Sequence, residues 1–371
     1  MHLEKLGITQ FRNYDFLELE FCPGINILTG DNGEGKTNVL ESIHYLSMTR
    51  GFQAQGEKYA IQESAPFFMC EGHWQHQEES FSVQCNYVPG KGKKVLINGK
   101  ATRRLSEHIG RIPLIIVLPN DTQLIYGTPS LRRRFADAFI SQYDPEYLRQ
   151  LIVYDKALIQ RNAQLARFAE GQPFDPDLLG LWDRQLIPAG RFIHAKRVEF
   201  LQEYSPLFTR YFHLIVSDKE QPVIHYKSQF TTNTQEEWEE LFRQNREKER
   251  YSQRSAIGIH KDDLSFLIDG QPVKNFGSQG QQKTFLISLK LAQYEMLLQH
   301  NERPPLLLLD DIFDKLDMNR LSSIAAILEK EVRGQVFITD TSLDRTRQIF
   351  EQVTTKDLRF FRVAKGEVSE I

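Results

Sequence analysis

The chain has 371 residues, of which 40% are hydrophobic and 26% charged, a balance that suits a folded globular protein and excludes an intrinsically disordered one. Its formal net charge of −3 excludes a protein that is basic throughout, so any binding of nucleic acid must use local clusters of positive charge. No apolar run reaches the roughly 18 to 20 residues that span a bilayer, and the N-terminal residues carry charges where a signal peptide needs an apolar stretch. The sequence therefore predicts a cytoplasmic protein, and its length favours two lobes over one.

The N-terminal part of the chain predicts two strands and then a helix. Leu17, Leu19 and Phe21 alternate with glutamates, and this period of two is typical of a half-buried strand. Residues 24–29 form a short apolar strand that leads into a glycine-rich turn. Beyond the turn, apolar residues recur at helical spacing, so the predicted order is strand, loop, helix.

The glycine-rich turn carries the complete G-x-x-x-x-G-K-T pattern of a phosphate-binding P-loop. Its residues are Gly30, Asp31, Asn32, Gly33, Glu34, Gly35, Lys36 and Thr37, and Asn38 follows them. In such a loop the glycines turn backbone N–H groups toward the phosphates, and the helix start adds partial positive charge. Lys36 is expected to reach the β and γ phosphates, and the Thr37 hydroxyl to ligate Mg²⁺. The sequence therefore predicts that these nine residues bind ATP.

The middle of the chain predicts a small sheet followed by a helical region. Residues 66–118 predict an antiparallel sheet, with a hairpin turn at Asn98-Gly99 and the apolar run Ile112 to Leu118 as its last strand. From Pro119 to about Arg254 the sequence is typical of helices, which predicts a mostly helical second lobe. Residues 257–273 predict a hairpin, and a long helix follows it.

A run of four leucines, Leu306 to Leu309, predicts a strand that is buried on both faces of a parallel sheet. Asp310 and Asp311 follow at its carboxyl end, an arrangement that matches a Walker B motif. Asp310 is expected to hold Mg²⁺, and Asp311 to orient the attacking water beside the γ-phosphate. Together with Lys36 these aspartates are the candidate catalytic residues, and the alternative is a solvated turn after a core strand.

The segment Gly277 to Gln281 opens the long helix and resembles the signature motif of ABC ATPases. Small residues at a helix start leave N–H groups open to an anion, and the Ser278 hydroxyl adds a donor for a γ-phosphate. A simple helix cap is the alternative interpretation. Because this motif faces the P-loop of the other subunit in ABC proteins, Ser278, Gly280 and Gln281 are expected to complete the ATP site across a head-to-tail, two-fold dimer.

Two further segments concern ATP hydrolysis. Asp314 to Asp317 resembles the D-loop of ABC ATPases and is expected to line the dimer seam. Residues 335–339 predict the last core strand, and the segment Thr339 to Thr341 stands where many ABC ATPases have a histidine that senses the γ-phosphate. No histidine is present in that segment, which predicts slow hydrolysis and a switch-like role.

Short motifs occur along nearly the whole chain. They are Phe11-Arg12-Asn13-Tyr14, Asn98-Gly99-Lys100, Pro119-Asn120-Asp121, Ser130 to Phe135, Gln160-Arg161-Asn162, Gly258 to Leu264 and Ser278 to Thr284. In kind and order they resemble the motifs of the RecF family of bacterial recombination mediators. The departures are small: Ile259 stands where proline is common, and Lys261 and Lys283 stand where arginine is common.

The resemblance implies an SMC-like ATPase head without a coiled coil. It implies binding of double-stranded, gapped or junction DNA by an ATP-dependent homodimer with a weak, DNA-stimulated ATPase activity. It further implies that the protein acts with RecO and RecR type partners and helps to load RecA at gaps and stalled replication forks. By the same resemblance, Arg12 is expected to reach the bound nucleotide.

The expected fold is α/β: an ABC/SMC-type P-loop ATPase head, with a mixed sheet core and an antiparallel subsheet, plus a mostly helical second lobe. Residues 1–118 and 300–371 are expected to form the ATPase lobe. Residues 119–299 are expected to form the helical lobe that carries the signature motif.

Two clusters of positive charge suit contacts with DNA phosphates, namely Lys91, Lys93 and Lys94 and then Arg103 and Arg104. Solvated loop charge is the alternative interpretation. The ATPase motifs also allow two other functions: an ABC transporter ATPase subunit, which the helical insert argues against, or a nearly inert nucleotide-binding platform for RecR-like partners.

Overall fold

The chain forms two compact units. The computed structural model describes residues 1–52, 56–170, 172–216, 220–313 and 318–371. Unit 1 consists of Met1–Asp121, Arg210–Ser217 and Lys283–Ile371, and unit 2 consists of Thr122–Thr209 and Asp218–Gln282. Two long helices, α5 (Pro176–Ile215) and α9 (Gln279–His300), contribute residues to both units. Among the described residues, no helix has the length and apolar character needed to cross a membrane.

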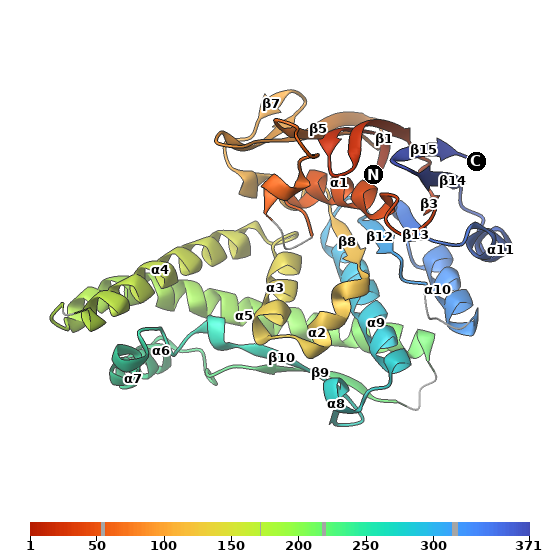
Figure 1. Ribbon diagram of the computed structural model, residues 1–371. Coiled ribbons are helices and arrows are strands. Elements are labelled where there is room, and N and C mark those ends of the chain that lie inside the picture. The colour runs from red at the N-terminus through yellow and green to blue at the C-terminus, as the bar shows by residue number, and fades with distance from the viewer. Residues whose placement is uncertain (53–55, 171, 217–219, 314–317) are drawn as a thin grey trace. The chain divides into compact units, whose positions relative to one another are not determined.

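Unit 1 contains two sheets, whose strands are labelled in Figure 1 where there is room. The first is antiparallel, in the order β2-β1-β4-β5-β6-β7, with β1 (His2–Phe11), β2 (Tyr14–Glu20), β4 (Phe68–His76), β5 (Glu79–Val88), β6 (Gly92–Ile97) and β7 (Lys100–Ala101). The second runs β15-β14-β3-β13-β12-β8, with β3 (Ile25–Thr29), β8 (Leu114–Val117), β12 (Leu306–Asp310), β13 (Val336–Asp340), β14 (Leu358–Ala364) and β15 (Glu367–Glu370). Its strands pair in parallel, except that β15 is antiparallel to β14. Besides its parts of α5 and α9, unit 1 contains the helices α1 (Lys36–Met48), α10 (Met318–Lys330) and α11 (Leu343–Val353), with short 3-10 turns at Glu57–Ala60 and Leu105–Glu107.

The second sheet positions the phosphate-binding loop. Every residue of β3, β12 and β13 is buried, as expected for parallel strands covered on both faces. Strand β3 lies between β13 and β14 and leads directly into the P-loop, after which α1 begins. The predicted order of strand, loop and helix is confirmed. One hydrophobic core joins residues of both sheets with α1, including the edge-to-face rings of Phe11, Tyr45 and Phe68.

The predicted hairpin turn in the first sheet is confirmed. Asn98 and Gly99 have φ angles of 47° and 74°, the left-handed conformation that a two-residue hairpin turn requires. The assignment of residues 112–118 to this antiparallel sheet is wrong, because β8 pairs in parallel with β12. A continuous apolar run is typical of a strand in a parallel sheet, but it does not reveal which strand will be its neighbour.

Residues 335–339 are predicted from the sequence to form the last core strand: the core strand is confirmed as β13, but it is not the last one. Strand β14 follows and pairs in parallel with β3, so it borders the strand that carries the P-loop. Its sequence, LRFFRVA, includes Arg359 and Arg362 between apolar residues, and these charges obscure a strand that has buried Phe360, Phe361 and Val363.

Unit 2 is mostly helical, as the sequence predicts. Its elements are α2 (Gln123–Tyr126), α3 (Pro129–Ile140), α4 (Pro145–Ala169), part of α5, β9 (Pro222–Lys227), α6 (Gln235–Gln244), α7 (Arg246–Ser252), β10 (Asp263–Ile268), β11 (Gln271–Pro272) and α8 (Val273–Phe276). Strand β9 lies within the region expected to be helical, which corrects that expectation. It pairs antiparallel with β10, whose hairpin with β11 is the one the sequence predicts.

The C-terminal part of α9 belongs to unit 1, whereas the sequence predicts that residues 119–299 form one helical lobe. Three contacts explain this packing. The ring of Phe285 lies edge-on to that of Phe212, Lys290 pairs with Asp121 at 3.1 Å, and the Tyr294 hydroxyl accepts a hydrogen bond from Gly334 N–H at 2.7 Å.

Candidate functional site

The P-loop is built around three glycines with positive φ. Gly30, Gly33 and Gly35 have φ angles of 155°, 87° and 116°, a range that residues with side chains rarely adopt. Space is equally restrictive, because a Cβ at Gly30 would lie 2.1 Å from the Val363 carbonyl oxygen of β14, and one at Gly35 would lie 2.6 Å from the Tyr14 hydroxyl. The loop conformation is therefore fixed both by its glycines and by the neighbouring strands.

Lys36 is folded back over this loop. Its Nζ donates hydrogen bonds to the carbonyl oxygens of Gly30 at 2.7 Å and Asp31 at 2.9 Å, and the residue is only 6% exposed. The ammonium group thus lies on the loop whose backbone N–H groups are expected to face phosphates. An anion bound there would meet both the lysine charge and the N-terminal end of α1.

Asn13 stabilises the loop from the side. Its Nδ2 donates to the Glu34 carbonyl oxygen at 3.1 Å, and its Oδ1 accepts from Asn38 Nδ2 at 2.7 Å. The Glu34 carboxylate in turn accepts from the backbone N–H of Lys365, in the turn after β14. Sequence reasoning placed Asn13 in a family motif but gave it no role. Only the contact in space reveals that it supports the P-loop.

Arg12 is held by the protein itself. Its guanidinium donates to both carboxylate oxygens of Glu41, at 2.8 and 3.0 Å, and to the Tyr59 carbonyl oxygen at 2.9 Å. The Glu41 side chain is fully buried, so this is a bidentate, charge-assisted pair inside unit 1. The expected contact of Arg12 with a nucleotide stays a prediction, and it would have to use the N–H groups that Glu41 and Tyr59 leave available.

The Walker B carboxylate of Asp310 lies directly against the P-loop helix. Thr37 Oγ1 is 2.9 Å from Asp310 Oδ1 and 3.1 Å from Oδ2, and Thr339 Oγ1 is 2.8 Å from Oδ1. Asp310 is 4% exposed, and this burial raises its pKa, while the hydroxyls of Thr339 and Thr37 act in the opposite direction. The structure thus brings together Lys36, Thr37 and Asp310, the residues expected to bind phosphate and metal.

Asp311 follows in a left-handed backbone conformation, with a φ of 49°. Its N–H donates to Thr339 Oγ1 at 2.9 Å. It therefore lies at the same strand end as Asp310, where the sequence expects a residue that orients water. The predicted D-loop, Asp314 to Asp317, lies outside the described residues.

The signature motif begins α9. Ser278 Oγ accepts from Gln281 N–H at 3.2 Å, and Gln281 Oε1 accepts from Ser278 N–H at 2.8 Å, which forms a reciprocal capping box. Gln281 also donates to Glu220 Oε1 at 2.9 Å. The helix-cap interpretation is thus confirmed for the single chain. The γ-phosphate role of Ser278, Gly280 and Gln281 stays a prediction.

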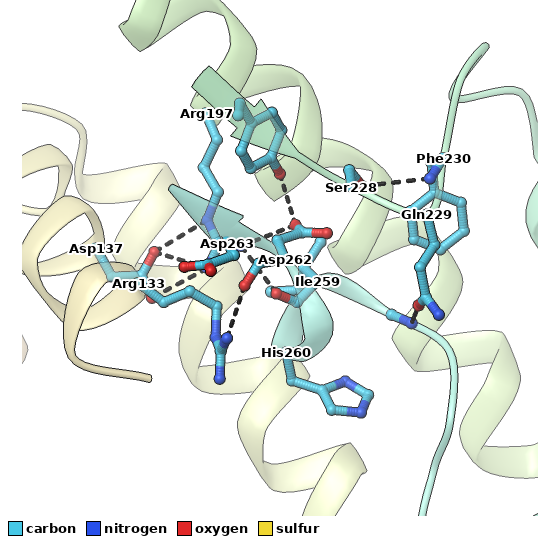
Figure 2. Close-up of polar contacts among 12 residues, drawn as sticks. Arg133, Asp137, Arg197, Ser228, Gln229, Phe230, Ile259, His260, Asp262 and Asp263 are labelled. Atoms are coloured by element: carbon cyan, nitrogen blue, oxygen red, sulfur yellow. Dashed lines mark hydrogen bonds and ion pairs between the residues drawn. The ribbon is translucent and has the colours of Figure 1, made fainter. Parts of the chain in front are cut away.

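The motif Gly258 to Leu264, whose role the sequence left open, supplies internal contacts of unit 2 (Figure 2). Asp262 is 1% exposed, and its Oδ2 accepts from Arg197 at 3.0 Å and from the Tyr226 hydroxyl. Arg197 also donates to Asp137, and Arg133 donates to the Asp262 carbonyl oxygen at 2.6 Å. These contacts join α3, α5, β9 and the segment before β10, so this part of the motif stabilises the helical unit.

Its neighbours act in the same way. Arg132 donates to both carboxylate oxygens of Asp263, at 2.7 and 3.0 Å, an ion pair that joins α3 to β10. His260 contacts the Tyr154 hydroxyl and the Ser255 carbonyl oxygen, and burial lowers its pKa to about 4. His260 is therefore neutral near pH 7.

A P-loop on a parallel sheet, a Walker B carboxylate bonded to the P-loop threonine and an antiparallel subsheet define an ATPase head of the ABC/SMC class. The family model of the RecF/RecN/SMC N-terminal domain matches residues 2–357. The chain is 41% identical over 370 residues to the DNA replication and repair protein RecF of Cytophaga hutchinsonii, covering 100% of this chain and 97% of that protein. It is 41% identical over 349 residues to the protein of the same name from Flavobacterium johnsoniae, covering 94% and 96%. The chain belongs to the RecF family.

Solved structures agree with this assignment. A structure of the recombination mediator protein RecF with ATP, from the RecFOR pathway, is 28% identical and superposes with a TM-score of 0.89, covering 100% of this chain and 97% of that one. The Smc head domain of Pyrococcus furiosus is 14% identical, with a TM-score of 0.55 over 100% of this chain and 96% of that one, a likeness of fold alone.

Proposed function

We propose that this protein is an ATP-dependent DNA-binding protein that dimerises on ATP and acts in the recombinational repair of gapped DNA and stalled replication forks. RecO and RecR type partners, and the loading of RecA, belong to the same proposal. The observation that carries it is the contact of the P-loop residue Thr37 with the Walker B residue Asp310. The relatives of this chain are DNA replication and repair proteins named RecF, and the solved RecF structures come from the RecFOR pathway.

The residues present fit ATP with Mg²⁺. A threonine hydroxyl has one proton, and Thr37 directs it to Asp310, so the oxygen lone pairs stay available to a hard cation. In this proposal residues Gly30 to Asn38 and Arg12 hold the nucleotide, Lys36 neutralises phosphate charge, and Thr37 and Asp310 hold Mg²⁺. The bound cation would screen the charges of the phosphates. Asp311 would orient water for hydrolysis.

The proposal of a dimer is based on the residues at the start of α9. Ser278 is exposed at a helix N-terminus, where its hydroxyl proton can turn to a partner while its oxygen caps the Gln281 N–H. In the proposed head-to-tail dimer, Ser278, Gly280 and Gln281 contact the γ-phosphate of the nucleotide on the partner's P-loop. Hydrolysis removes that phosphate and so releases the dimer. The absence of histidine from 339–341 supports turnover below roughly one per second.

The decisive experiment measures DNA binding and dimerisation together. Gel shifts on duplex, gapped and single-stranded DNA, with ATP, ADP or no nucleotide, are paired with sedimentation of the same samples. We expect tight binding to double-stranded or gapped DNA, and a dimer, with ATP alone. Lys36→Ala should lose both the DNA binding and the dimer, because the loop loses its cation. Lys94 is an exposed residue of the first sheet, so Lys94→Ala should retain ATP binding and the dimer. Equal DNA binding with and without ATP contradicts the proposal.

A further inference from the structure

Thr339, at the end of β13, contacts both Walker B residues. It is fully buried and faces Asp310 in the parallel register of β12 and β13. Its Oγ1 lies 2.8 Å from Asp310 Oδ1 and 2.9 Å from the backbone nitrogen of Asp311. One hydroxyl group therefore joins the proposed metal ligand to the proposed water-orienting residue.

The direction of these two hydrogen bonds follows from their chemistry. A backbone N–H can only donate, so the Thr339 hydroxyl accepts from Asp311 and must direct its single proton to Asp310. This proton and that of Thr37 both point at the Asp310 carboxylate, which favours its ionised form. A side chain of the same shape without a hydroxyl would remove this hydrogen-bond partner from both the Asp311 N–H and the buried Asp310 Oδ1, and such a loss is costly.

The hydrogen bond also fixes the backbone of Asp311. A residue other than glycine in the left-handed region costs on the order of 1 kcal/mol and persists when its surroundings hold it there. At Asp311, whose φ is 49°, the bond from its N–H to Thr339 supplies such a constraint. Because the backbone sets the direction of the Cα–Cβ bond, the contact with Thr339 is one of those that determine where the Asp311 side chain starts.

The end of β13 is itself held by hydrogen bonds. Asp340 is 1% exposed and accepts two hydrogen bonds from Arg345, at 2.7 and 2.9 Å, and one from Ser342 N–H at 2.9 Å. On its other side, Thr339 lies next to Leu28 of β3 in the parallel register. The hydroxyl is thus held between the strand that leads to the P-loop and the strand that carries the aspartates.

We propose that Thr339 is a positioning residue for ATP hydrolysis, which orients the Asp310 carboxylate toward Mg²⁺ and holds Asp311 in the conformation that directs water. This inference rests on the proposed ATPase function. It separates two properties: the P-loop binds the nucleotide without Thr339, whereas the metal requirement and the rate of hydrolysis depend on it.

The test compares Thr339→Val, which keeps the shape and removes the hydroxyl, with Thr339→Ser, which keeps the hydroxyl. Thr346→Val is the matched control, because the buried Thr346 hydroxyl of α11 bonds, within the described part of the chain, only to the carbonyl oxygens of Ser342 and Leu343. ATP affinity without Mg²⁺, the Mg²⁺ concentration at half-maximal turnover, kcat and KM are measured on the full chain with gapped DNA.

For Thr339→Val we expect unchanged ATP affinity without Mg²⁺, a half-maximal Mg²⁺ concentration raised about tenfold, and kcat lowered about 10- to 100-fold, as for loss of a hydrogen bond to a charged group. Thr339→Ser should restore kcat to within about threefold, and Thr346→Val should match the wild type. Thermal unfolding checks that each variant is folded. If Thr339→Val is not folded, Thr339→Ala, which adds no bulk, takes its place in the comparison.

Two results overturn the inference: a valine variant with wild-type kcat and Mg²⁺ requirement, or a folded serine variant as inactive as the valine one. Failure of the proposed function looks different. A wild-type protein without turnover contradicts the ATPase, and the Mg²⁺ dependence of ATP binding then decides the role of Thr339. That dependence should be weakened in the valine variant alone, and equal values in all variants overturn the inference.

Discussion

Single side chains at the nucleotide site are held by hydrogen bonds within the protein. Lys36 lies on the loop carbonyl oxygens, Thr37 is bonded to Asp310, and Arg12 is bonded to Glu41. Groups fixed in this way lose little conformational freedom on binding, which is the advantage of preorganisation. Sequence patterns predicted roles for Lys36, Thr37 and Asp310, because each belongs to a short local motif. They did not predict the contacts of Glu41 and Thr339, because the partners of these residues lie far away along the chain.

His44, in the helix that follows the P-loop, provides a pH test of the fold. Its Nδ1 lies 2.7 Å from the Arg50 carbonyl oxygen, and burial lowers its pKa to about 4. The folded state thus keeps His44 neutral, whereas the unfolded chain takes up a proton below about pH 6.5. The free energy of unfolding should therefore fall as the pH drops from about 6.5 to about 4, by at most about 1.4 kcal/mol per pH unit from this residue.

The measurement is chemical denaturation at pH 7, 6 and 5 for the wild type and His44→Gln. Glutamine can donate to the same carbonyl oxygen but does not titrate, so the variant should show a shallower loss of stability at low pH. Stability at pH 7 controls for the change in packing. Parallel pH profiles for the two proteins would disprove this contribution of His44.

At the scale of helices and strands, local pattern predicted which segments are regular but not which strands are neighbours. The strand, loop and helix of the P-loop, the hairpins at 98–99 and 269–270 and the long helix α9 are all present. The errors concern β8, β9 and β14, each of which pairs with a strand distant in sequence. Such pairings depend on long-range contacts that hydrophobic periodicity does not encode.

The start of α9 gives a test at this scale. Ser278→Arg should leave ATP binding intact, because the P-loop lies elsewhere in the chain, but should abolish the ATP-dependent dimer and tight DNA binding. Loss of the cap alone costs the helix about 1 kcal/mol. Sedimentation with ATP measures the dimer, and calorimetry measures nucleotide affinity.

Ser278→Ala separates the two effects, because it removes the hydroxyl and the cap without adding bulk or charge. We expect it to weaken the dimer less than the arginine variant. A Ser278→Arg protein that dimerises normally on ATP would refute the shared-site dimer.

The whole molecule has a small net negative charge, so DNA binding has to use local surfaces. Around β6 and β7, Lys94, Arg103 and Arg104 are exposed, whereas Lys93 pairs with Glu57. Side chains of this kind bind phosphates without reading sequence. The proposed ATP-dependent dimer would therefore gain its preference for a DNA structure from shape and from dimerisation.

Reversing Lys94, Arg103 and Arg104 to glutamate should weaken DNA binding in the presence of ATP by at least tenfold on all sequences. It should also make the dependence of log affinity on log salt shallower, by about one unit of slope for each DNA phosphate that the variant no longer neutralises. Filter binding across a range of salt concentrations checks both. The ATP-dependent dimer should persist in this variant. An unchanged dependence of affinity on salt would show that these residues do not contact DNA phosphates.

The order of strands in the second sheet has a consequence for synthesis on the ribosome. Strand β3 leads into the P-loop, but both of its neighbours, β13 and β14, are translated long after it. The nascent chain thus carries an apolar, unpaired strand through most of elongation, and a topology that pairs strands so distant in sequence folds slowly. A fragment cut short before β14 would lack Val363, which lies against Gly30, and Lys365, which bonds to Glu34, so we expect it to bind ATP more weakly than the finished protein.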